Sequence, residues 1–106
     1  MKLLTKEIEK QIPELYSREY GCDDPRFVCK FFDPIGSWTW YVLEGEKQED
    51  GDWLFYGLVD GIEKEWGYFR LSELESIATK SRTHRAIGLG IERDRYFSNE
   101  SVKEYV

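Results

Sequence analysis

The chain has 106 residues, of which 16% are aromatic, and it carries a formal net charge of −6. A chain of this length holds one hydrophobic core, so we predict a single domain over residues 1–106. Positive and negative residues are interspersed and the balance is acidic. We therefore expect no nucleic-acid partner, because domains that bind nucleic acid present a basic face to the phosphates.

The N-terminal segment predicts a short amphipathic helix. Thr5 suits an N-cap, and apolar residues recur at helical spacing over residues 8–15. Pro13 interrupts the run, so the helix either ends near Gln11 or continues as a second turn that opens at Pro13. No apolar run is long enough for a signal peptide or a membrane span, so we expect a cytoplasmic protein without a membrane partner.

Four short aromatic-rich segments predict an antiparallel sheet in the middle of the chain. Aromatic and β-branched side chains pack well on a pleated surface, and glycine or acidic turns separate the segments. The predicted strands are residues 26–33, 37–44, 53–60 and 66–71. The third is apolar on both faces, which predicts a central or covered strand, and Gly57 within it predicts a bulge or a ring lying over it.

The residues after the fourth strand predict a short helix and then irregular structure. Ser72 and Glu75 fit a capping box, so we expect a helix over residues 72–79. Residues 80–85 are polar and basic and predict a loop, whereas residues 91–97 fit either a fifth strand or a helical turn. The predicted fold class is α+β: an antiparallel sheet of four to five strands, with an N-terminal helix and a helix after the fourth strand.

The two cysteines predict free thiols and no metal site. A reducing compartment disfavours a disulfide between Cys22 and Cys29. Their spacing matches no zinc motif, and His84 is the only histidine. Cys29 alternates with Phe27 and Phe31, so we expect these three side chains to face the core together and Cys22 to be more accessible. We expect no bound metal and no cofactor.

No catalytic constellation is marked in the sequence. His84 lies in the predicted polar loop, where we expect a mobile, solvated side chain without a carboxylate partner in a cleft. Gly88 and Gly90 lie in a segment too short for a phosphate-binding loop. The acidic residues 44–52 lack the alternating ligands of a calcium loop and predict a solvated hairpin tip. These features favour a protein that is not an enzyme.

Glu92, Arg93 and Asp94 form the best-matched charged motif of the chain. One interpretation is a recognition element for a partner. We favour a structural ion-pair network, in which Arg93 fastens this segment to the sheet, because apolar residues flank the charges.

Alternation along the strands predicts a binding surface on the outer face of the sheet. If Lys30 and Arg70 point to solvent, alternation places Trp66 and Tyr68 on the same outer face. In the second strand we assign Tyr41 outward and Trp38 and Trp40 inward. Tyrosine, tryptophan and arginine commonly anchor interfaces, so we predict that these five outward residues bind a partner. The alternative is that a terminal helix covers the rings, or that they pack across strands.

The chain also resembles a small bacterial family, in a series of segments that covers nearly its whole length. The segments in order are KLLTKEIEKQIPELYS, KFFDP, WTWYVLEG, WLFYGLVDG, GYFRLSELESI and GLGIERDRYF. The family is catalogued only as a domain of unknown function, and its members are common on plasmids, phages and integrative elements. The resemblance implies a small cytoplasmic domain, often encoded near conjugation or anti-restriction genes, and it brings no catalytic residues.

Together these features favour a non-enzymatic accessory protein that binds another protein, in a mobile-element or host-defence context. The acidic hairpin tip would favour a basic partner, chiefly through the rate of encounter. One alternative is a single-stranded nucleic-acid binder that uses the aromatic face. A further alternative is a hydrolase with a carboxylate site that the sequence does not mark.

Overall fold

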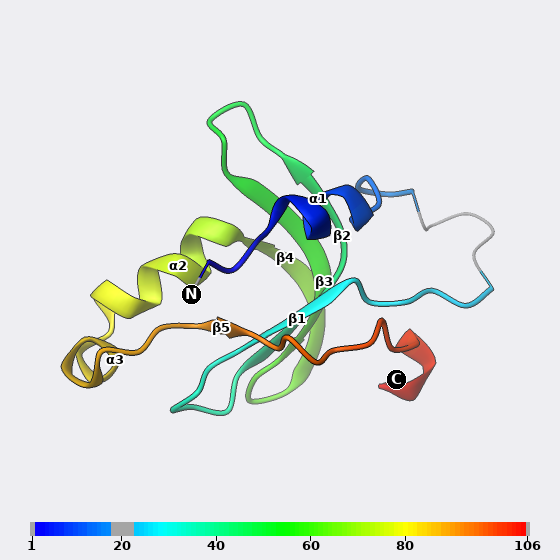
Figure 1. Cartoon of the computed structure of the whole chain (residues 1–106). Helices are drawn as coiled ribbons and strands as arrows, with labels where there is room; N and C mark the ends of the chain where they lie inside the picture. Colours follow the sequence, from blue (N-terminus) through cyan, green and yellow to red (C-terminus); the bar gives the residue numbers. More distant parts are fainter. Residues whose placement is uncertain (1, 18–22, 106) are drawn as a thin grey trace.

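The structure, a computed structural model, describes residues 2–17 and 23–105 of the chain (Figure 1). In chain order the elements are α1 (Lys6–Gln11), β1 (Cys29–Phe32), β2 (Thr39–Lys47), β3 (Trp53–Asp60), β4 (Lys64–Arg70), α2 (Leu71–Lys80), α3 (Arg82–Ile87), β5 (Glu92–Arg93) and the 3₁₀ helix η1 (Val102–Glu104). The strands form one antiparallel sheet in the order β4-β3-β2-β1-β5. The predicted α+β fold is confirmed, with β5 as the fifth strand.

Local sequence signals place α1 and the central strands correctly. Thr5 caps α1, since its hydroxyl accepts the N–H of Ile8 at 3.3 Å, and the helix ends before Pro13. β3 has the predicted bounds. β2 extends beyond its predicted end, because its pairing with β3 continues to Lys47 opposite Trp53.

A bulge in β2 explains the glycine inside β3. The register between the two strands shifts between Val42 and Glu44, and Gly57 lies opposite Val42. A Cβ atom on Gly57 would lie 1.8 Å from the carbonyl oxygen of Tyr41, so no other residue fits without movement of the backbone. The predicted bulge is therefore present, in the strand that faces Gly57.

Both faces of the sheet are covered, and the first face carries the larger core. Its buried residues are Leu3, Leu4, Cys29, Phe31, Trp40, Val42, Phe55, Phe69, Leu74 and Ile91. Leu74 comes from α2, and Ile8 and Ile12 of the N-terminal segment pack against the same core. Trp38 was also expected to point inward, but it is exposed and its ring lies over Gly61.

The C-terminal segment covers part of the second face. The buried residues there are Phe27, Tyr41, Leu43, Leu58 and Val102, and the Tyr105 ring lies 4.6 Å from the Tyr41 ring. Tyr41 lies on this outer face as assigned, but the expectation that it is exposed is wrong, because the C-terminal segment covers it and leaves it 6% exposed. The prediction for Phe27 is also wrong: the chain bends at Val28, which turns Phe27 away from the first core.

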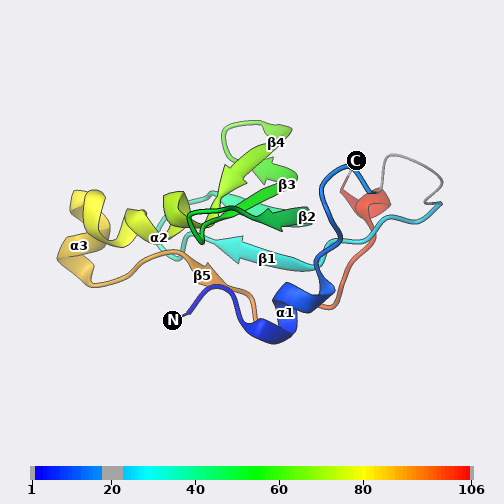
Figure 2. The same ribbon diagram turned by 90° about the horizontal axis from the view of Figure 1, so that it is seen from above.

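Two predictions about the residues after β4 are wrong. Arg70 is the N-cap of α2 and makes no side-chain cap bond, so Ser72 lies inside the helix rather than capping it. The predicted loop contains α3, which Ser81 caps at its start and Gly88 ends in the left-handed conformation at φ +80°. Figure 2 shows α2 and α3 at one end of the sheet and the C-terminal segment at the other. Among the described helices, none has the length and apolar character needed to cross a membrane.

Candidate functional site

A row of aromatic rings, of which three are exposed and one is half-buried, lies on the second face of the sheet, at and beside the strand farthest from β5. It consists of Trp66 and Tyr68 of β4, Tyr56 of β3, and Tyr16 of the segment after α1; we call these four residues the aromatic row. Trp66 is 39% exposed and Tyr68 is 50% exposed. Tyr56 packs against the second core, which also buries Tyr41, whereas the rings of β4 remain exposed to solvent.

Ring contacts hold the aromatic row in place. The Tyr56 ring stacks on Trp66 with centroids 5.9 Å apart, and it lies 4.9 Å from the Tyr68 ring. The hydroxyl of Tyr68 donates to that of Tyr16 at 3.1 Å. Phe27 of the second core stacks against Trp66 at 5.9 Å. The rings are therefore held in place by packing.

A buried carboxylate positions the Tyr16 segment. Glu44 of β2 accepts the N–H of Tyr16 at 2.9 Å, and Gly45 donates to the carbonyl of Pro13 at 2.9 Å. Tyr16 itself has φ +67°, a conformation that is uncommon for a residue with a side chain. The sequence analysis missed Tyr16 and Tyr56, because nothing local indicates that residues 13–17 lie beside β2.

The five predicted binding residues fall into two groups. Trp66, Tyr68 and Arg70 lie on one face of β4, as alternation predicted. Tyr41 and Lys30 are cross-strand partners in β2 and β1, on the far side of β3. There Lys30 lies 5.6 Å over the buried Tyr41 ring and 4.0 Å from Asp94. The structure therefore brings together only the three residues of β4.

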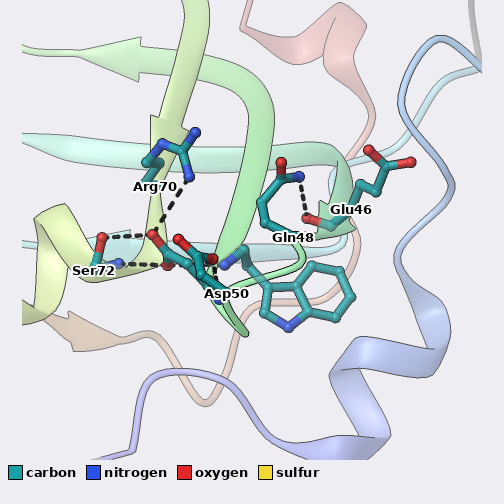
Figure 3. Close-up of polar contacts among 7 residues, drawn as sticks. Glu46, Gln48, Asp50, Arg70 and Ser72 are labelled. Atoms are coloured by element: carbon teal, nitrogen blue, oxygen red, sulfur yellow. Dashed lines mark hydrogen bonds and ion pairs between the residues drawn. The ribbon is translucent and has the colours of Figure 1, made fainter.

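Arg70 meets the acidic hairpin through Asp52. Figure 3 shows Arg70 and Ser72 beside the hairpin residues Glu46, Gln48 and Asp50. Asp52 accepts the Ser72 hydroxyl at 2.6 Å and the Ser72 N–H at 3.1 Å, and it lies 3.7 Å from Arg70. Burial raises the pKa of Asp52, but the hydrogen bonds from Ser72 and Trp53, with the charge of Arg70, more than offset this, so its pKa is below the ordinary value. Asp52 thus supplies the carboxylate cap of α2 from the hairpin.

His84 is buried and paired, so the prediction of a solvated loop histidine is wrong. It is 8% exposed; its Nε2 lies 2.7 Å from Oδ1 of Asp33, and its Nδ1 lies 2.6 Å from Oγ of Ser81. Burial raises the pKa of Asp33, but the hydrogen bond from His84 and the N–H of Ile35 outweigh this and lower it overall.

The Asp33–His84–Ser81 chain has the composition of a catalytic triad, but its contacts suit a structural joint. The Ser81 hydroxyl also accepts the N–H of His84, at 3.4 Å, as the N-cap of α3. Asp33 lies in the turn between β1 and β2, 51 residues from His84. The three side chains therefore dock α3 on this turn.

The remaining predicted residues make structural contacts. Arg93 donates to the carbonyl oxygens of Lys2 and Leu3 at 2.9 and 2.7 Å, so it fastens the N-terminal segment. Asp94 faces Lys30, and Glu92 lies opposite Phe32 in the sheet. Cys29 is buried as predicted, and burial raises the pKa of its thiol to about 12.

Two predictions about thiols and metals are only partly covered by the structure. Cys22 lies outside the described residues. Within residues 2–17 and 23–105, no group of three or more acidic, histidine or cysteine side chains could hold a metal ion.

Comparison with known proteins identifies the family and nothing closer. Residues 3–106 match the family described as "Protein of unknown function (DUF2958)", so the chain belongs to it. Neither the curated proteins nor the solved structures contain a match to the chain.

Proposed function

We propose that this member of the family is a non-enzymatic accessory protein that binds another protein through the aromatic row. The observation that supports this most is the exposure of Trp66 and Tyr68, which lie next to each other on one face of β4. Large rings that are already fixed lose little conformational entropy on binding, and each can bury about 150–250 Å². Several kcal/mol of binding free energy could come from these two side chains.

The acidic hairpin tip suggests the charge of the partner near that end of the sheet. Glu46, Glu49 and Asp50 are exposed there. They would favour a basic region on the partner, mainly by raising the rate of encounter, and this effect should weaken as salt increases. We further propose that the protein acts in the cytoplasm, in a mobile-element or host-defence context.

One observation favours a second candidate, a single-stranded nucleic-acid binder. Lys64 and Arg70 flank Trp66 and Tyr68 on the same face of β4, and stacking rings beside cations suit such ligands. The net charge of −6 and the ion pair between Arg70 and Asp52 weigh against it.

The test compares the double variant Trp66→Ala/Tyr68→Ala with Tyr96→Ala. Tyr96 is 94% exposed and lies outside the row, so it controls for the loss of an exposed ring. Tagged proteins are used to capture partners from a bacterial lysate, and melting temperatures establish that each variant is folded. We expect a protein that both wild type and Tyr96→Ala retain to be lost by the double variant. Equal capture by all three proteins would contradict the proposal, and nucleic acid in the eluate would favour the second candidate.

A further inference from the structure

β4 is a long, open edge of the sheet. Among the described residues it pairs with β3 alone, and Figure 2 shows it at the edge of the sheet opposite β5. The opposite edge, β5, has only two residues, Glu92 and Arg93. An edge strand leaves a row of N–H and C=O groups that can pair with another extended chain. Gly67, at the middle of β4, has open space where a side chain would project.

The side chains of β4 indicate which residue types a strand added at this edge should carry. Lys64, Trp66, Tyr68 and Arg70 alternate onto the second face. Directly opposite residues on neighbouring strands favour opposite charges and pairs of aromatic or β-branched side chains. Arg70 already has a carboxylate at 3.7 Å, that of Asp52. Lys64 is exposed and lies opposite Asp60 of β3, but among the described residues it makes no ion pair within 4.0 Å. The unmet preference is therefore for an acidic residue opposite Lys64.

A second copy of this chain is a poor occupant of the edge. Two β4 strands paired antiparallel about Gly67 would place Lys64 of each copy opposite Arg70 of the other. Like charges directly opposite each other destabilise a strand pair, and this pairing would contain two such contacts. In this register the edge is thus charged against self-association, and it remains open to a different chain.

We propose that β4 binds an extended segment of a partner protein as a sixth strand. On the second face this segment places β-branched or aromatic residues opposite Tyr68 and Trp66, and a carboxylate opposite Lys64. The pattern is two apolar residues and one acidic residue at alternate positions. The inference rests on the proposed function, because it assigns a binding mode to the same surface; the basic region proposed for the hairpin tip lies outside the paired segment.

The first experiment selects peptides from a phage-displayed library of random linear 12-residue segments on the wild-type protein. We expect enriched sequences with apolar residues at alternate positions and Asp or Glu two residues from them. The same selection on Lys64→Glu should replace the acidic residue by Lys or Arg, and Lys64→Glu should bind the original peptides about fivefold more weakly. Glu65→Lys, a charge reversal on the other face of β4, should keep the acidic preference. The absence of enrichment, or an unchanged preference in Lys64→Glu, would overturn the inference.

The second experiment tests the backbone pairing. An enriched peptide is made in two forms, each N-methylated at one of the two alternate sets of amides; only methylation of the set that faces β4 should abolish binding. Hydrogen exchange of the β4 amides should slow when the unmethylated peptide binds. Equal effects of the two methylated forms, or protection confined to other elements, would refute strand addition. If the double alanine variant still loses its lysate partner in that case, the proposed function stands and only the binding mode fails.

Discussion

Gly57 is the residue at which the sheet tolerates least change. The bulge in β2 brings the Tyr41 carbonyl to where a side chain would begin, whereas its cross-strand partner Gly67 faces open space. We expect Gly57→Ala to lower the free energy of unfolding by about 3 kcal/mol, since backbone must move. Gly67→Ala should be neutral or slightly stabilising, by up to about 1 kcal/mol. Urea denaturation of the two variants measures both; similar losses would show that the bulge is not the cause.

Asp52 should make the free energy of unfolding depend on pH in the acidic range. The pKa of Asp52 is lowered in the folded state. Its contribution to the free energy of unfolding is therefore complete above the ordinary aspartate pKa of about 3.9, and it is lost as the pH falls through the lower pKa of the folded state. Asp52→Asn should cost about 1–2 kcal/mol at pH 7, because a charged cap is lost. The difference from wild type should shrink as the pH falls below about 4.

The matched control for this prediction is Glu49→Gln at the exposed hairpin tip. It removes the same charge without a cap, so its stability should differ little from wild type at either pH. Denaturant titrations at pH 7 and pH 3 give the comparison. A difference between Asp52→Asn and wild type that stays constant with pH would contradict the role of the carboxylate.

At the level of elements, the docking of α3 depends on the hydrogen bonds of His84 to Asp33 and Ser81 rather than on a stripe of apolar residues. A helix of six residues has little stability of its own, and His84 is its one buried residue. We expect His84→Ala to cost about 1–3 kcal/mol, because it leaves the Asp33 carboxylate without its partner, and to speed hydrogen exchange in α3. Thr83→Ala, at an exposed neighbouring position, should leave the exchange of the α3 amides as in wild type. Unchanged exchange in His84→Ala would show that other contacts dock the helix.

The elements that sequence could predict are those with local signals. Alternating aromatic side chains predicted the strands, and Thr5 predicted the start of α1. The cap of α2 could not be predicted, because Asp52 reaches it from 20 residues away. The same holds for α3, whose contact with Asp33 spans 51 residues. Alternation assigned Tyr68 and Trp66 to the outer face, but it could not show that a distant segment covers Tyr41.

At the scale of the whole molecule, the sheet is covered unevenly, and this creates the candidate site. The N-terminal segment and α2 pack on the first face, while the C-terminal segment covers the second face over β1, β2 and part of β3. The cover stops short of β4, so its rings remain exposed beside an open edge. The position of the C-terminal segment, rather than the composition of the strands, therefore decides which aromatic residues of this face are buried and which are exposed.

The two tyrosines of the C-terminal segment test this division directly. The Tyr105 ring lies 4.6 Å from Tyr41 and 5.7 Å from Phe27, whereas Tyr96 is 94% exposed. We expect Tyr105→Ala to lower the free energy of unfolding by about 2 kcal/mol, since it opens the second core to water. Tyr96→Ala should change it by less than about 0.5 kcal/mol.

Denaturation followed by tryptophan fluorescence measures the free energy, and an apolar dye reports whether the second core is exposed. Tyr105→Ala should bind more dye than Tyr96→Ala under native conditions, because Tyr41 and Phe27 lose their cover. Two variants of equal stability and equal dye binding would contradict the structure of this face. Tyr41 would then be available for binding, and the aromatic surface would extend across the sheet from β4 to β1.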